Sequence, residues 1–158
     1  MAKYDDASWH YGGDFPEDLP NENGATHIGF FITWSIDNDL ISEFQIEESE
    51  GDVEKVKNGF LTGAEFLIKN CDEKFTDEDL NDLGNRFASD YYEDNTEFGK
   101  IHGSYLHDYQ QTFENFFKDE GMELKSFYHI ENNLTNYNII KAVIDKRFLQ
   151  WKEFIKER

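Results

Sequence analysis

Apolar side chains recur every three or four residues over much of the chain, which is the spacing of an amphipathic helix. The clearest case is the C-terminal segment, where Asn133 or Thr135 is a suitable N-cap and the pattern continues to about Glu157. We expect one long helix here. Its predicted buried stripe consists of Tyr137, Ile140, Ile144, Phe148, Trp151 and Ile155.

A second helix is predicted over residues 25–40, where Ile28, Phe31, Ile32 and Ile36 share one face. The β-branched content leaves a strand open as the alternative. We expect the helix to end near Asn38, because asparagine tolerates a left-handed cap. Gly29 is expected to allow close packing against the N-terminal segment.

The middle of the chain contains several weaker helical patterns. Residues 53–71 predict one or two helices with Phe60 on the apolar face, and Thr76 is expected to begin a helix with Leu83 in its buried stripe. A further helix is predicted from about 104 to 117. The short aromatic segment 126–130 favours a strand or an extended conformation.

The fold class predicted from these elements is mainly α, or α+β with few short strands. The length of 158 residues suits one domain spanning 1–158. We expect a compact, mostly helical body over residues 25–158. Residues 1–24 are expected to form an extended aromatic arm in front of it.

The arm is predicted from its turn-forming residues. Gly12 and Gly13 reach positive φ without steric cost, and Pro16 and Pro20 favour extended conformations in the residues before them. Large apolar side chains in such a loop usually pack onto a core. We therefore expect the arm to be held by burial of Trp9, Tyr11, Phe15 and Leu19.

The net charge of the chain limits the kinds of partner that it can bind. The formal net charge is −19, from 34 acidic and 15 basic residues. This excess argues against nucleic acid or an anionic membrane as a partner, because both need lysine and arginine to contact phosphate. It permits high solubility alone, cation binding or a basic protein partner. The candidate partner-binding residues are Glu47, Glu48, Glu50, Asp52, Glu54, Asp72, Glu73, Asp77, Glu78, Asp79 and Asp82.

An alternative site lies near the N-terminus, where carboxylates and imidazoles cluster as Asp5, Asp6, His10 and Asp14, with His27 further on. Such groups bind divalent cations. No HExxH motif or EF-hand loop is present, however, and chance clusters are expected in so acidic a chain. We favour aspartates that cap turns and a His27 that makes a structural hydrogen bond, and we expect no metal and no cofactor.

Other catalytic patterns are weak. His102, Ser104 and His107 lie in one short stretch without a nucleophile elbow. Cys71 has Asn70 and Asp72 as neighbours and therefore lacks an adjacent base. A single cysteine and no recognisable leader lead us to expect a cytoplasmic protein.

The strings YDDASWHY, GDFPEDLP and ATHIG, followed by Trp34, resemble the opening of an uncharacterised family of small acidic bacterial proteins. The C-terminal IDKRFLQW, with Asp145, Arg147, Phe148 and Trp151, resembles the end of the same family. Its members are similar to the immunity proteins that neutralise toxins exchanged between bacteria. The resemblance brings no established activity with it.

Charge and resemblance together favour a non-catalytic, cytoplasmic immunity protein that covers the active site of a basic toxin domain with its acidic surface. The alternatives are a metal-dependent hydrolase that uses the N-terminal cluster and a non-catalytic adaptor domain.

Overall fold

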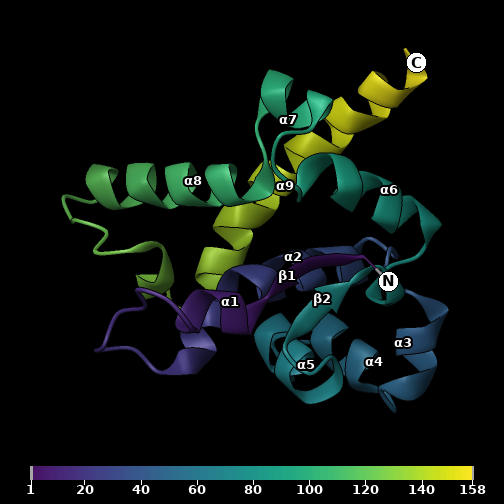
Figure 1. Ribbon diagram of the computed structural model, residues 1–158, viewed down its shortest axis with the longest axis horizontal. Helices are drawn as coiled ribbons and strands as arrows, with labels where there is room; N and C mark the ends of the chain where they lie inside the picture. The colour runs from purple at the N-terminus through teal and green to yellow at the C-terminus, as the bar shows by residue number, and fades with distance from the viewer. Residues whose placement is uncertain (1, 158) are drawn as a thin grey trace.

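The computed structural model describes residues 2–157 and is mainly α-helical, as the sequence predicts (Figure 1). The α-helices are α1 (Ala7–Tyr11), α2 (Thr26–Asp37), α3 (Glu43–Glu48), α4 (Asp52–Lys57), α5 (Gly63–Asn70), α6 (Asp82–Tyr91), α7 (Glu97–His102), α8 (Tyr105–Asp119) and α9 (Leu134–Lys156). The short 3-10 helices are η1 (Asn21–Ala25), η2 (Asp77–Asp79) and η3 (Phe127–His129).

Helix α2 is the central element, because nearly all of its residues are buried. It lies directly against α5, and the contact depends on two glycines: a Cβ on Gly29 would collide with the backbone of Ala64, and one on Gly63 would collide with the carbonyl of Gly29. Gly29 therefore allows a close approach as expected, but its partner is α5 and not the N-terminal arm.

The end of α2 is close to its predicted position. Asn38 is the C-cap and donates its side-chain amide to the carbonyl of Trp34 at 2.8 Å. The left-handed residue is the next one, Asp39, with φ 59°. Asparagine therefore closes the helix through its side chain, and aspartate takes the left-handed conformation.

Two short strands join the N-terminus to the middle of the chain. Strand β1 (Lys3–Asp6) pairs antiparallel with β2 (Lys74–Thr76), with Asp5 opposite Phe75. The first part of the expected extended arm is therefore a strand followed by a short helix, α1. Thr76 ends β2 and is the N-cap that the sequence predicts, but the helix it begins is only the short η2. The longer helix, α6, begins at Asp82 behind an Asn81 cap.

The core is dominated by aromatic rings. Both Trp34 and Trp151 are fully buried, and they surround Phe87 at ring-centroid distances of 5.4 and 5.3 Å. Helix α9 contributes most of its predicted stripe, and Asn133 caps it by accepting a hydrogen bond from Asn136 N at 2.8 Å. Such rings stabilise a core through large buried area and edge-to-face packing.

Several residues expected in the core are exposed. Trp9 is 58% exposed and lies under the ammonium of Lys3, while Tyr11 and Phe15 are only partly buried. Phe60 is 82% exposed and Leu83 41%. Trp9 and Phe60 occur in or beside helices of six residues or fewer, where spacing alone does not determine which face is covered. Leu83 lies in the first turn of α6. Residues 126–130 contain η3 and not a strand.

No helix among residues 2–157 combines the length and the apolar character needed to span a membrane.

Candidate functional site

Two acidic stretches that are far apart in the sequence lie at one end of the molecule. Ser42, the N-cap of α3, donates its backbone N–H to the carbonyl of Asp79 at 3.0 Å and its hydroxyl to the carbonyl of Glu78 at 2.7 Å. Helix α3 therefore lies beside η2 and the start of α6. We call this surface the acidic end. It comprises Glu47, Glu48, Glu50, Glu54, Glu78 and Asp82, all exposed.

Most of these carboxylates are not neutralised within the molecule. Glu54 lies 3.8 Å from Lys57, but within residues 2–157 no cation is within ion-pair distance of Glu47, Glu48 or Glu50. These three belong to α3 and the turn after it. The acidic end therefore has an uncompensated negative charge toward solvent.

Apolar side chains are exposed on the same elements. Phe44 and Ile46 on α3 and Leu83 on α6 each expose two fifths or more of their surface. The exposure of Phe44 and Ile46 could not be predicted from apolar spacing, because α3 has only six residues and its buried residue is the polar Gln45. Exposed apolar side chains among acidic ones are typical of a protein-binding site. A surface that only keeps the protein in solution does not need them.

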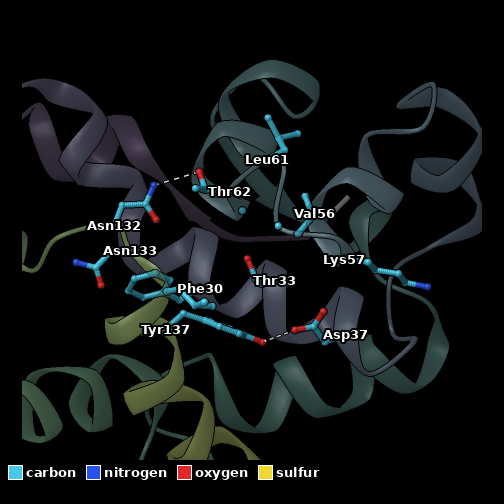
Figure 2. A pocket seen from close by; sticks show the side chains of 13 residues that line it. Phe30, Thr33, Asp37, Val56, Lys57, Leu61, Thr62, Asn132, Asn133 and Tyr137 are labelled. Carbon is cyan, nitrogen blue, oxygen red and sulfur yellow. Dashed lines mark hydrogen bonds between the residues drawn. The ribbon is translucent and has the colours of Figure 1, made fainter.

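A pocket of about 260 Å³ borders the acidic end through α4 (Figure 2). Phe30 from α2, Val56 from α4 and Tyr137 from α9 supply its apolar surface. Asp37, the last residue of α2, accepts a hydrogen bond from the Tyr137 hydroxyl at 2.7 Å. The sequence did not identify this pocket, because its walls come from segments about a hundred residues apart.

Two predicted partner-binding residues are buried. Asp52 is 1% exposed, and hydrogen bonds from Asn70 at 3.0 Å and Lys69 at 2.9 Å lower its pKa to about 2. Asp79 accepts from Thr76 N and from the Gln45 amide, both at 2.8 Å, and burial raises its pKa. Both stabilise local structure and do not belong to the exposed surface.

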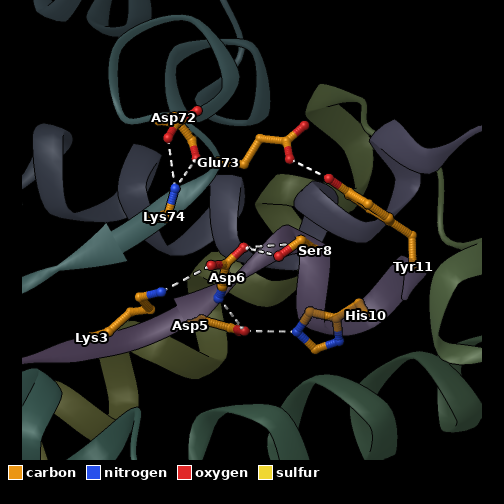
Figure 3. A network of polar contacts seen from close by, with 9 residues as sticks. All are labelled: Lys3, Asp5, Asp6, Ser8, His10, Tyr11, Asp72, Glu73 and Lys74. Atoms are coloured by element: carbon orange, nitrogen blue, oxygen red, sulfur yellow. Dashed lines mark hydrogen bonds and ion pairs between the residues drawn. The ribbon is translucent and has the colours of Figure 1, made fainter. Parts of the chain in front are cut away.

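The remaining predicted acids lie near the β1–β2 sheet (Figure 3). Asp72 is exposed and pairs with Lys74 at 2.6 Å, and Glu73 accepts from the Tyr11 hydroxyl at 2.5 Å. Asp77 is partly buried as the first residue of η2. Asp72 and Glu73 therefore have partners within the fold, which reduces their value as contacts for another protein.

The alternative N-terminal cluster is brought together only in part. Asp6 accepts from Ser8 N at 2.9 Å as the N-cap of α1 and pairs with Lys3 at 3.1 Å, as a turn-capping aspartate is expected to do. Asp14 is exposed in the loop after α1. The residues that converge are Asp5, His10 and His27, whose ligand atoms lie within 4.8 Å of one another.

The carboxylate of Asp5 is the centre of this network. Oδ1 accepts from Asp6 N at 2.8 Å and contacts His10 Nε2 at 2.7 Å (Figure 3). Oδ2 accepts from the Tyr92 hydroxyl at 2.6 Å and contacts His27 Nε2 at 3.0 Å. Burial raises the pKa of the Asp5 carboxyl, but the hydrogen bonds from His10 and His27 outweigh it and hold the pKa well below its usual range.

The two histidines have different surroundings. His27 is buried, and burial lowers its pKa despite the hydrogen bond to Asp5, so the ring is neutral at pH 7 and Nε2 carries the proton. Within the described chain its Nδ1 has no partner. His10 is nearer the surface, and its Nδ1 lies 2.7 Å from the hydroxyl of Tyr128.

Two histidines and one carboxylate are a ligand set that suits several divalent metals. A carboxylate has about four acceptor positions, however, and four donors already surround Asp5. A metal would have to displace at least two of them. The Asp5 carboxylate is therefore saturated by hydrogen bonds, one of them from His27. Tyr92 and Tyr128, which complete the network, carried no signal in the sequence.

The second histidine stretch forms no hydrolytic triad. Ser104 donates its hydroxyl to Asp94 at 3.0 Å, and Asp108 is held by Arg147 at 2.8 Å and by the Tyr91 hydroxyl at 2.7 Å. Cys71 lies beside Asp79, and burial raises the pKa of its thiol, which makes it a poor nucleophile.

A family model described as Domain of unknown function (DUF7832) matches residues 3–130. No curated protein and no solved structure matches the chain.

Proposed function

This chain belongs to the family described as Domain of unknown function (DUF7832), and we propose that it is an immunity protein that binds and neutralises a cognate antibacterial toxin domain. The acidic end binds the basic active-site cleft of the toxin and blocks it. The protein itself has no catalytic role. It acts in the cytoplasm, where a toxin that attacks nucleic acids or nucleotides would meet its substrate.

The observation that supports this proposal is the composition of the acidic end. Glu47, Glu48 and Glu50 are exposed and unpaired among the described residues, and Phe44 and Ile46 are exposed beside them. Opposite charge raises the association rate and selects a basic partner, while buried apolar contacts slow dissociation. A purely solubilising surface needs the carboxylates but not the exposed aromatic and aliphatic groups.

A metal-dependent hydrolase is the second candidate, because Asp5, His10 and His27 place three potential ligands together. The saturated carboxylate makes it the weaker of the two. A non-catalytic adaptor domain remains the third candidate, and it differs from the first in having no toxin gene beside its own.

The test begins with the gene directly upstream. Its C-terminal domain should kill cells that lack this protein and spare cells that express it. The purified pair should associate more slowly as salt rises, because charges are screened within about 8 Å at physiological ionic strength. Dissociation should change much less.

The triple charge reversal Glu47→Lys, Glu48→Lys and Glu50→Lys locates the contact. It should slow association and abolish protection. The matched control reverses Asp119, Glu120 and Glu123, which are also exposed and lie at the end of α8 and just after it. The control changes the net charge equally but should keep most of the protection. Equal protection by both variants would show that the acidic end is only a solvated face.

A further inference from the structure

We propose that the pocket between α2, α4 and the start of α9 binds one arginine or lysine side chain of the protein partner. This inference rests on the proposed function and names the contact that anchors the complex. The pocket has about 260 Å³ (Figure 2). Sites for drug-sized ligands usually have about 300–1,000 Å³, so this one suits a single long side chain.

The inner wall of the pocket is apolar and aromatic. The rings of Phe30 and Tyr137 lie 6.0 Å apart, and Val56 and Leu61 face the same space. The methylene stem of arginine or lysine can cover such a surface while its charged group stays at a polar edge. The aromatic faces also attract a cation, and a guanidinium more than an ammonium.

Two hydroxyls at the polar edge beside Asp37 already donate their protons within the fold. The Thr33 hydroxyl donates to the carbonyl of Gly29 at 2.8 Å, and the Tyr137 hydroxyl donates to Asp37 at 2.7 Å. Burial and the nearby Asp37 raise the pKa of Tyr137, so its hydroxyl keeps its proton. A ligand group that binds beside Asp37 must therefore donate hydrogen bonds, as guanidinium and ammonium groups do.

Asp37 supplies the charge. It is exposed, and within residues 2–157 no cation pairs with it. Its carboxylate accepts one hydrogen bond in the fold and has further acceptor positions open. It is also the last residue of α2, where the helix dipole adds negative potential. Both effects favour a cation at this position.

Among the described residues that line the pocket Lys57 is the one cation, and its ammonium lies near other carboxylates. It lies 3.6 Å from Asp39 and 3.8 Å from Glu54, and it points away from Asp37 (Figure 2). The position beside Asp37 is therefore left for a cation from outside.

The pocket is continuous with the acidic end. Helix α4 contributes Glu54 to that surface and Val56 to the pocket wall. Leu134, at the start of α9, lines the pocket and is largely exposed. Phe60, in the loop after α4, is also largely exposed but does not line the pocket. A partner steered to the acidic end thus meets a concave anchor surrounded by apolar groups, which is the usual setting of an interface hot spot.

The first experiment uses n-butylguanidinium as the probe, followed by amide chemical shifts in NMR. The probe should shift amides that line the pocket in a saturable way, whereas n-butanol, which lacks the charge, should bind far more weakly. Asp37→Asn keeps an acceptor for Tyr137 and should preserve the fold, yet it should weaken binding about tenfold, as expected for loss of a charged hydrogen-bond partner. Asp119→Asn is the matched control and should change nothing.

Two results would overturn the proposal: probe-induced shifts spread over the acidic end without saturation at the pocket, or equal affinity of wild type and Asp37→Asn.

The second experiment separates the pocket from the proposed function. In the complex with the upstream toxin domain, Asp37→Asn should raise the dissociation rate and leave association nearly unchanged. If the toxin binds and the substitution has no effect, the pocket proposal is wrong and the immunity function stands. If the probe binds at the pocket but the upstream product is neither toxic nor bound, the immunity function is wrong while the cation site stands.

Discussion

The imidazole of His27 donates a hydrogen bond from Nε2 to Oδ2 of Asp5 at 3.0 Å and so connects α2 to β1. His10 and Tyr92 contact the same carboxylate from α1 and the end of α6. One buried charge thus connects β1 and α1 to α2 and to the end of α6. A buried carboxylate that uses all its acceptor positions favours a single arrangement of the chain, and loss of one of its donors is costly.

Asp5→Asn should therefore destabilise the fold. The asparagine amide would place N–H groups opposite donors of the network, so that donor faces donor. It would also remove the negative charge to which the donors of His10, His27 and Tyr92 are directed. We expect a loss of at least about 2 kcal/mol in the free energy of unfolding, measured by urea denaturation. Asp14→Asn is the control and should stay within about 0.5 kcal/mol of wild type. Similar midpoints for both variants would mean that the Asp5 network contributes little.

The buried His27 should make stability depend on pH. Its folded-state pKa is lowered, so below about pH 6.5 the unfolded chain binds a proton that the folded chain does not. Its contribution is fully present above that pH and is lost as the pH falls toward the folded pKa. In this window the free energy of unfolding should fall by up to about 1.4 kcal/mol per pH unit.

The variant His27→Gln tests this sign. Glutamine can donate to Asp5 but does not titrate, so the variant should lose part of the pH dependence, even if it is less stable at pH 7. Asp5 faces His27 directly, and the rings of His10 and Tyr109 lie 4.4 and 5.9 Å away. An unchanged slope between pH 7.5 and 5.5 would show that His27 does not set the dependence.

The tryptophans should differ sharply in their contribution to stability. Trp34→Ala removes a fully buried ring whose Nε1 donates to Asp145 at 2.8 Å, and should cost about 3–5 kcal/mol. Trp9→Ala removes a ring that is 58% exposed and should cost less than about 1 kcal/mol. Unfolding curves of the two variants test the ranking. A large loss for Trp9→Ala would mean that the ring supports the fold through contacts with α1.

This contrast shows what the sequence could reveal. Trp151 occurs in a long helix, where the three-and-four spacing fixes which side is buried, and its burial was predicted correctly. Trp34 was not on the face predicted for α2, and it is buried because nearly all of that helix is buried. Trp9 and Phe60 occur in or beside helices of six residues or fewer. In so short a helix the apolar spacing repeats too few times to define which face is buried. In such segments tertiary contacts decide burial, and a single sequence does not contain them.

The candidate site was predictable to a similar degree. The acidic character of α3 and the approach of His10 to His27 could be anticipated from composition and local clustering. The junction of α3 with η2 and the Asp37 pocket could not, because each is formed by segments joined only in the folded chain. The burial of Asp52 and Asp79 was missed for the same reason, since their partners lie on neighbouring elements.

The contact between α2 and α5 should be intolerant of any side chain. Gly29→Ala places a Cβ against the backbone of Ala64, which no rotamer change can relieve, so α5 must move away from α2. We expect a loss of at least about 2 kcal/mol, as for overpacking in a tight core. Gly13→Ala is the control, because nothing lies within 4 Å of its added Cβ. Comparable stability of the two variants would show that the helices separate readily.

Metal content separates the two leading functional candidates. Asp5 receives four donors, and any metal at Asp5, His10 and His27 must displace some of them and fix both imidazoles as ligands. We therefore expect protein purified without chelator to contain less than about 0.1 equivalent of zinc, manganese or iron by elemental analysis, and added zinc to leave its melting temperature unchanged. His10→Ala gives the control, because it removes one ligand at the least buried position of the network. About one equivalent of metal in the wild type that is lost in His10→Ala would make the hydrolase the better explanation of this cluster. The four hydrogen bonds to the Asp5 carboxylate would then describe only the metal-free protein. The exposed charge of the acidic end would need an explanation other than toxin binding.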